Sequence, residues 1–254
     1  MRALQMAALV ALGTLTAGAW TATCRADDEV FDRVVPLKAT NSFELQNVNG
    51  SVDVEGWDRD AVEIHAVKTA KSSRADLNRV RIEIESAADH VSVQTVYPKD
   101  DQDQDEVSIA YTIRVPQRVL LRQVSTVNGD VRVHGVNATG KLRSVNGDVE
   151  AYDSTGALSA ETTNGNILLE LCSLTNSPVS AQTVNGSIVV SVPGGSGAAL
   201  DARSLNGEVS SDLPFAGSSS GRRDFHGMLG TGGTSMRLRT VNGSIHITEM
   251  RQTP

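Results

Sequence analysis

The chain has 254 residues, a formal net charge of −7, and only two Trp, three Tyr and four Phe. This length suits one large all-β domain or two small ones, and the negative charge argues against nucleic acid and anionic membrane surfaces as main partners. A core with so few aromatic side chains is unusual in a globular domain. It is typical of a solenoid, whose narrow interior is filled by stacked aliphatic side chains.

Residues 1–26 predict a secretory signal peptide. Arg2 precedes an apolar stretch, residues 7–20, that is too short to span a bilayer, and Cys24-Arg25-Ala26 places small residues around a cleavage site. The alternative is a lipoprotein signal acylated at Cys24, but Thr21-Ala22-Thr23 is a poor approach to such a site. We therefore expect export to the periplasm or the exterior, and no further segment is apolar enough to serve as a transmembrane anchor.

Cleavage after Ala26 has two consequences for the rest of the chain. It removes Arg2 and Arg25, which lowers the formal net charge from −7 to −9. It also leaves Cys172 as the only thiol, so we expect no intramolecular disulfide even in an oxidising compartment.

Residues 27–120 predict an N-terminal β region with longer, partly antiparallel strands. Alternating apolar residues mark four strands, at Val62–Val67, Val80–Ile84, Val91–Val93 and Val107–Pro116. The segment Lys71–Asp76 reads as a polar turn that can hold one helical turn. Five acids lie in Asp100–Glu106, and two interpretations stay open for them: a solvated loop, or a weak divalent-cation site.

Residues 121–254 predict the repeat region, because one tetrad, Thr/Ser-apolar-Asn-Gly, recurs along the chain. After Gly129 the glycine spacings are 18, 18, 21, 21 and 36, and a first copy ending at Gly50 stands 79 residues earlier. The Asn-Gly pairs are Asn49-Gly50, Asn128-Gly129, Asn146-Gly147, Asn164-Gly165, Asn185-Gly186, Asn206-Gly207 and Asn242-Gly243.

Alignment of the copies on Gly shows what each position does. Apolar residues recur seven and five positions before Gly, and again two and four positions after it, with Arg122 and Gly140 as exceptions. These period-2 patterns predict two short strands, each with one buried face, joined by an Asn-Gly corner. The position two before Gly is also apolar, which we attribute to a bend of the chain into the corner.

Asn-Gly between strands also favours hairpins, but the same two half-strands recur in the same order, which favours parallel stacking. The predicted fold is an all-β, single-stranded parallel β-solenoid, similar to a β-helix, with coils of 18–21 residues. Stacked Asn side chains would form an amide ladder and the Thr/Ser side chains a hydroxyl ladder. We therefore interpret the Asn-Gly residues as structural turns and not as ligand-binding groups.

Two places are candidate partner contacts. The first is a Gly-rich insertion at 214–234, where Arg222, Arg223, Phe225 and His226 could meet an anionic or polysaccharide partner. The alternative is an irregular coil that covers the solenoid end. The second is an outward-facing apolar patch made by Leu168 and Val189, which the repeat places on neighbouring coils.

The chain resembles the bacterial "putative adhesin" domain of unknown function, the Toastrack family. Three segments carry the resemblance: Val48–Gly56, the strand Ile113–Pro116 leading into Val127–Val131, and Gly227–Gly233 leading into Leu238–Ile245. The resemblance implies an extracytoplasmic β-solenoid that is linked to envelope stress or surface binding. It implies no catalytic residues and no cofactor.

Motifs for chemistry are not found in the sequence. It has no Gly-x-Ser-x-Gly, His-Glu-x-x-His or Cys-x-x-Cys, and His134 and His246 occupy different positions of the repeat, so no metal site is predicted. We expect a non-enzymatic, adhesin-like module that binds an envelope protein or polysaccharide. Two alternatives stay open: a structural homo-oligomer that self-assembles, and a polysaccharide-active β-helix enzyme.

Overall fold

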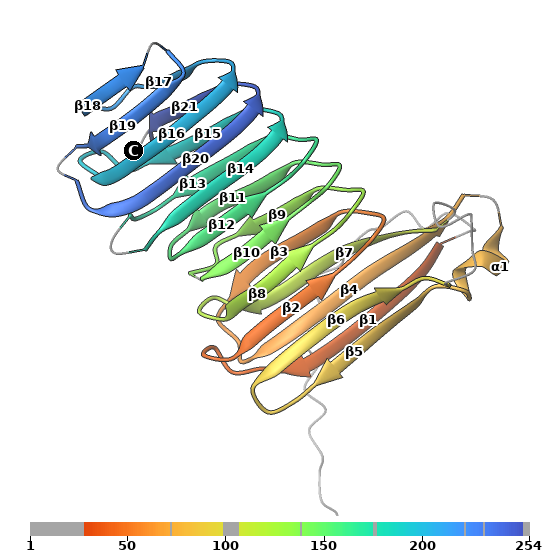
Figure 1. The fold of residues 1–254 in the computed structure, drawn as a ribbon. Helices are drawn as coiled ribbons and strands as arrows, with labels where there is room; N and C mark the ends of the chain where they lie inside the picture. Colours follow the sequence, from red (N-terminus) through yellow and green to blue (C-terminus); the bar gives the residue numbers. More distant parts are fainter. Residues whose placement is uncertain are drawn as a thin grey trace, which may run out of the picture.

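The computed structural model describes residues 28–71, 73–98, 107–137, 139–174, 177–220, 222–230 and 232–250. Two β-sheets face each other along an elongated stack, with the N-terminal strands at one end and the C-terminal strands at the other (Figure 1). Among the described residues there is a single short helix, α1 (Arg74–Leu77), and it lies at the end of the stack that holds the N-terminal strands. No helix in this part of the chain is long and apolar enough to cross a membrane.

The two sheets hold ten and eleven strands. Sheet A runs in the order β1 (Asp28–Pro36), β4 (Ala61–Ala70), β7 (Val107–Pro116), β3 (Val52–Trp57), β9 (Val131–His134), β11 (Val149–Ser154), β13 (Ile167–Leu171), β15 (Ile188–Val192), β21 (Ile245–Glu249) and β17 (Val209–Ser211). Sheet B runs in the order β18 (Phe215–Ser220), β19 (Asp224–Leu229), β16 (Ala198–Asn206), β20 (Thr234–Asn242), β14 (Val179–Asn185), β12 (Leu158–Glu161), β10 (Gly140–Arg143), β8 (Leu120–Ser125), β2 (Ser42–Gln46), β6 (His90–Val96) and β5 (Arg81–Ser86).

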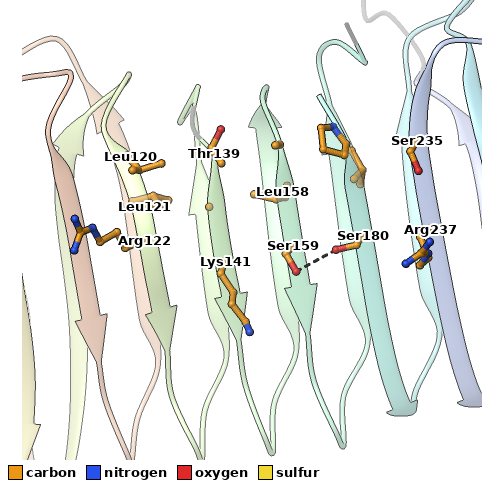
Figure 2. Close-up of a pocket in the computed structure, with 14 residues that line it drawn as sticks. Leu120, Leu121, Arg122, Thr139, Lys141, Leu158, Ser159, Ser180, Ser235 and Arg237 are labelled. Atoms are coloured by element: carbon orange, nitrogen blue, oxygen red, sulfur yellow. Dashed lines mark hydrogen bonds between the residues drawn. The ribbon is translucent and has the colours of Figure 1, made fainter. Parts of the chain in front are cut away.

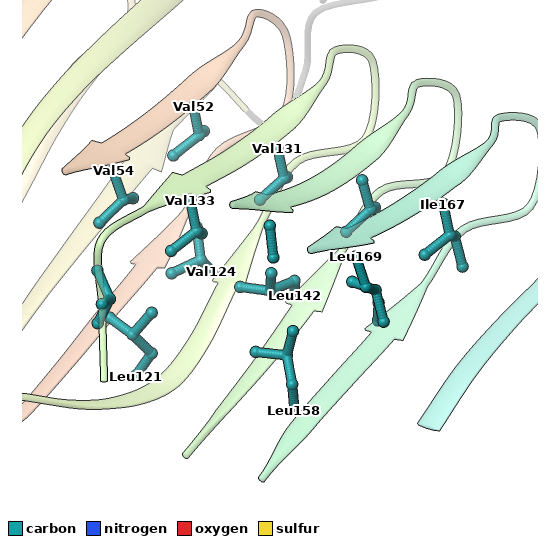
Figure 3. Close-up of a cluster of buried hydrophobic side chains, with 14 of the residues drawn as sticks. Val52, Val54, Leu121, Val124, Val131, Val133, Leu142, Leu158, Ile167 and Leu169 are labelled. Atoms are coloured by element: carbon teal, nitrogen blue, oxygen red, sulfur yellow. The ribbon is translucent and has the colours of Figure 1, made fainter. Parts of the chain in front are cut away.

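Each coil consists of one sheet B strand, a corner and one sheet A strand. The apolar positions predicted to face inward are buried in coil after coil, as Leu142, Val149 and Ile167 illustrate with fully buried side chains. Figure 3 shows these aliphatic side chains stacked between the two sheets. Burial of this aliphatic column is the main source of stability, because the hydrophobic effect scales with the apolar area removed from water.

Arg122 interrupts the inward pattern because β8 contains a bulge. Leu121 pairs with Gly140 and Val124 pairs with Leu142, so one extra residue lies between the two pairs. The same irregularity recurs against β2, where Phe43 pairs with Leu121 and Glu44 with Gln123. The bulge places Leu121 in the buried position, and Arg122 is left on the outer face of sheet B.

The sheets are mixed, and the predicted parallel solenoid of residues 121–254 is wrong only at its C-terminal end. Strands pair in parallel from β3 to β21 and from β2 to β20. At the N-terminal end β1, β4 and β7 are antiparallel, as are β5 and β6, which agrees with the expected longer strands of this half. At the C-terminal end β16, β19 and β18 are antiparallel, where the sequence predicted parallel coils interrupted by a Gly-rich insertion at 214–234.

The order of the coils along the stack departs from chain order at both ends. The coil β2–β3 lies between β6–β7 and β8–β9, and the late coil β20–β21 lies between β14–β15 and the earlier coil β16–β17. The late coil is held in register on both sides, since Met236 pairs with Val179 and with Leu200. The antiparallel hairpin β18–β19 occupies the other edge of β16, so β16 has no edge left for β14.

Candidate functional site

The predicted Asn-Gly residues lie at the corners, where the Asn side chains form a continuous ladder. Each amide nitrogen donates to the side-chain oxygen of the next Asn in the stack, at 2.7–2.9 Å, from Asn49 at one end to Asn206 at the other. Each bond uses one N–H group and one lone pair of the amides that it joins. The ladder therefore stabilises the stack.

The Thr/Ser position of the tetrad is buried and holds each corner to the next coil. Its hydroxyl donates to the Gly carbonyl of the neighbouring coil, as in Thr162 to Gly147 at 2.8 Å and Ser144 to Gly129 at 2.7 Å. The last position of the tetrad must be Gly because the coils approach each other closely. A Cβ added to this Gly would overlap the Gly carbonyl oxygen of the neighbouring coil. Gly165 and Gly207 lack a positive φ, yet they meet the same contact, so close approach is the common requirement.

The first tetrad has Asn47 in place of Thr or Ser, and its surroundings explain the change. The Asn47 amide nitrogen donates to the carbonyl of Ile109 at 3.0 Å, on the neighbouring coil, while its oxygen accepts from Thr95 at 2.9 Å. The Thr95 hydroxyl also bonds the Tyr111 hydroxyl at 2.8 Å. Burial raises the pKa of Tyr111 to about 12. This polar cluster is internal and structural, and the sequence pattern did not reveal it.

The apolar position two before Gly points outward and not into the core. We call this row the corner ridge, and four of its members are between 36% and 52% exposed. These four are Val127, Val184, Leu205 and Val241. The corner therefore directs these side chains to solvent. An exposed apolar row of this length is a candidate contact surface.

The Gly-rich insertion at 214–234 forms the antiparallel hairpin β18–β19, which corrects the expectation of an irregular loop or coil. Its Phe225 ring stacks on Phe215, with centroids 5.1 Å apart, and both pack against the core. The insertion does cover the end of sheet B, along the edge of β16.

The other insertion residues that we singled out make contacts within the protein, but their side chains stay exposed. Arg222 pairs with Glu208 at 3.0 Å with its side chain 82% exposed, and the Arg222 and Arg223 carbonyls accept from Val209 and Ser204. His226 lies 3.1 Å from Asp201 with its side chain 55% exposed. The backbone contacts close the last coil, and the hairpin serves there as a cap.

Leu168 and Val189 pair across β13 and β15 on the outer face of sheet A, half-buried. Their row continues with Glu150 on one side and His246 on the other. Beyond Glu150, Arg132 lies among three acids, 3.0 Å from Glu150, 2.7 Å from Asp130 and 3.7 Å from Asp53. Burial raises the pKa of Asp53, although Arg132 acts in the opposite direction. The apolar patch is therefore limited to two residues.

A groove of about 480 Å³ crosses the outer face of sheet B, and we call it the basic groove. Its lining comes from β8, β10, β12, β14 and β20 and from the residues just before them (Figure 2). Three cationic side chains line it, Arg122, Lys141 and Arg237, and none of its lining residues is acidic. Because the chain is negative overall, this groove is a local reversal of charge.

The centre of the basic groove is neutral and polar. Ser159 and Ser180 face each other, and their hydroxyl oxygens are 3.1 Å apart (Figure 2). Leu158 and Val179 also line the groove, although their side chains are buried in the core. The sequence interpretation missed this site, although one signal was available: Lys141, Ser159, Ser180 and Arg237 all stand six residues before a tetrad Gly.

Several predictions fall outside the described residues. These are the signal peptide at 1–26 with Cys24, and the acidic segment Asp100–Glu106. In the part of the chain that the structure covers, no group of three or more His, Cys, Asp or Glu side chains is placed to hold a metal ion.

The family model described as Toastrack DUF4097 matches residues 33–248. The chain belongs to this family. Among solved structures, a "putative cell adhesion protein" from Clostridium sporogenes is similar at 12% identity and a TM-score of 0.52, covering 87% of this chain and 100% of that one. A "putative adhesin" from Bacteroides fragilis matches at 12% identity and a TM-score of 0.40, covering 87% and 97%. No curated protein matches the Toastrack chain.

Proposed function

We propose that this Toastrack chain is an exported, non-enzymatic binding module that attaches to a cell-envelope or extracellular partner through the basic groove. One observation carries the proposal: three cations and no acid line a groove in a chain of negative net charge. The side chains project from strands of a continuous sheet, which fixes the spacing of their backbone positions before a partner arrives. A preorganised backbone lowers the entropy that binding must offset.

Two further observations support a binding role. The Clostridium structure with the same fold is described as a cell adhesion protein, "putative" in its own wording. On sheet A, the outward carboxylates of Asp53 and Glu150 are separated by Arg132, which pairs with both. Carboxylates engaged in this way are poorly placed for the paired acid and base work of glycoside hydrolysis.

The proposal is tested by co-sedimentation of the purified protein with isolated bacterial envelopes. A groove variant carries Arg122→Gln, Lys141→Gln and Arg237→Gln. A matched control variant carries Arg74→Gln, Arg79→Gln and Arg81→Gln, which removes the same charge at the N-terminal end. We expect saturable binding by the natural protein and the control, and loss of binding by the groove variant. Equal binding by both variants would overturn the proposal.

A second candidate function is self-assembly, and the corner ridge favours it. Exposed Val184, Leu205 and Val241 form an apolar row that a second copy could cover. Light scattering over a 100-fold range of protein concentration separates the two functions. A monomer at every concentration rules out assembly, while oligomers that dissociate on Leu205→Ser support it.

A further inference from the structure

The cations of the basic groove are too far apart to hold one small ion. Arg122 on β8 and Lys141 on β10 belong to neighbouring strands, whereas Arg237 on β20 is four strands from β8. At about 4.8 Å between strands, the two ends of the groove are roughly 19 Å apart. A ligand that contacts all three cations must therefore be extended and carry several negative charges.

The acids near the groove do not neutralise it. Lys141 lies 3.5 Å from Glu161, and both side chains are more than one-third exposed, so the pair contributes little. Arg237 lies 3.6 Å from Asp201. Asp201 is also shared with Arg239, at 2.8 Å, and with His226, at 3.1 Å. A ligand carboxylate at Lys141 or Arg237 therefore competes only with weak partners.

The centre of the groove indicates what lies between the ligand's charges. Ser159 and Ser180 are the polar groups between Lys141 and Arg237, and each hydroxyl can donate or accept. They match a ligand that carries neutral hydroxyl groups between its charged groups. An acidic polysaccharide has this alternation, with its carboxylates on a chain of hydroxyl-bearing rings.

Two other polymers fit the groove less well. Single-stranded nucleic acid is bound by stacking of its bases on aromatic side chains, and no lining residue of the groove is aromatic. An acidic peptide can add to a sheet edge, but both edges of β10, β12 and β14 are already paired with neighbouring strands.

We infer that the basic groove binds an acidic polysaccharide that lies along the solenoid axis, across β8, β10, β12, β14 and β20. This inference rests on the proposed function, because it assumes that the groove is the binding site. The carboxylates pair with Arg122, Lys141 and Arg237, and the sugar hydroxyls exchange hydrogen bonds with Ser159 and Ser180.

The test uses polygalacturonate as the anionic polymer, dextran as the neutral polymer, and monomeric galacturonate as the short ligand. Binding is measured by calorimetry at 50 mM and 500 mM NaCl. We expect polygalacturonate to bind more tightly than dextran or monomeric galacturonate at low salt. It should bind at least about 10-fold more weakly at high salt, because the Debye length falls from about 14 Å to about 4 Å. The groove variant should bind at least about 10-fold more weakly, because each exposed charge pair contributes roughly 2- to 5-fold.

The Arg74, Arg79 and Arg81 variant is the matched control and should bind polygalacturonate like the natural protein. Equal binding of the polymer by the groove variant would overturn the inference, as would tighter binding of polythymidylate than of polygalacturonate. If the groove variant loses envelope binding and the natural protein does not bind polygalacturonate, the inference fails and the proposed function stands. If the groove variant retains envelope binding, the proposed function fails, and the inference fails with it.

Discussion

The middle of the stack and its two ends are held together in different ways. From β8–β9 to β14–β15 the same contacts recur in every coil: an Asn rung, a buried hydroxyl on a Gly carbonyl, and an aliphatic column. The ends add unique contacts to these, such as Asn47 with Thr95 and Tyr111, or Phe225 on Phe215. Periodic contacts repeat one solution, whereas an end must cover a sheet edge that has no further coil to pair with.

The difference shows which parts of such a chain can change independently. In the middle, each coil packs against two neighbours with the same geometry. A change at one tetrad therefore disturbs only the contacts with those two coils. At the C-terminal end, the hairpin β18–β19, the coil β16–β17 and the inserted coil β20–β21 depend on one another.

The largest effect is expected from removing residues 234–254. Their strands β20 and β21 lie inside the stack, so deletion opens a gap between β14–β15 and β16–β17 and exposes apolar surface on both sides. We expect the variant to lose its cooperative thermal unfolding transition, as measured by circular dichroism. A deletion of β1, which pairs only with β4, should leave a cooperative but less stable protein. A folded, cooperative protein without residues 234–254 would show that β14 and β16 can pair directly.

A methyl group at a middle corner should have the second-largest effect on stability. Gly147→Ala places a Cβ against the Gly129 carbonyl, which the rigid neighbouring coil cannot move away, so we expect a loss of about 3 kcal/mol in the free energy of unfolding. Gly195→Ala is the control, because no atom lies within 4 Å of its added Cβ and only its φ of 75° is unfavourable. It should cost about 1 kcal/mol. Equal losses in urea denaturation would mean that conformation, and not close approach, selects glycine.

Removal of one buried hydroxyl should have a moderate effect. Thr162→Val deletes the donor to the Gly147 carbonyl and should cost about 1–2 kcal/mol, since a buried acceptor loses its partner. The neighbouring Thr163→Val is the matched control. It places on the corner ridge the residue that other coils already have, as at Val127 and Val145, and should change stability by less than about 0.5 kcal/mol. If both variants lose the same free energy of unfolding, the hydroxyl ladder does not contribute specifically to stability.

The smallest effect is expected on the outer face of sheet A. Burial raises the pKa of Asp53 above its ordinary value, so the fold favours the neutral carboxyl. The stability that this preference gives is present at low pH and is lost as pH rises through the folded-state pKa. Asp53→Asn should therefore be slightly more stable than the natural protein at pH 7. The gap in melting temperature should close below about pH 4. A gap that widens on acidification would contradict this sign.

The middle of the stack could be predicted because its determinants are periodic. The inward positions, the corner and the two strands per coil all follow from the tetrad and its spacing. Two features of the middle could not be read from the repeat because their causes are local. They are the bulge at Arg122 and the outward orientation of the corner ridge. An apolar residue next to a tight corner reads as buried, but at Val184 and Leu205 the corner directs the side chain to solvent.

The order of the coils could not be predicted, because β14, β16 and β20 carry the same columns in the same register. Val179, Leu200 and Met236 are interchangeable as partners, so the repeat alone allows either sequence of coils. The hairpin β18–β19 decides between them by occupying one edge of β16. Its strands lack the tetrad, and its glycines suggested a loop.

This order also determines the candidate site. If the coils followed chain order, Asp201 would stand next to Ser180 on the outer face of sheet B. The inserted coil places Arg237 there and moves Asp201 one strand further away. The basic charge of the groove is therefore a product of the topology as well as of the composition.

The inserted coils also constrain how the chain is assembled. A stack whose coils followed chain order could grow by adding each coil to the last as it leaves the ribosome. Here β2–β3 must wait for the later β6–β7, and β16–β17 finds its partner only when β20–β21 has arrived. A partly synthesised chain therefore lacks a coil from the interior of its stack, and assembly is completed only after residue 249 has left the ribosome.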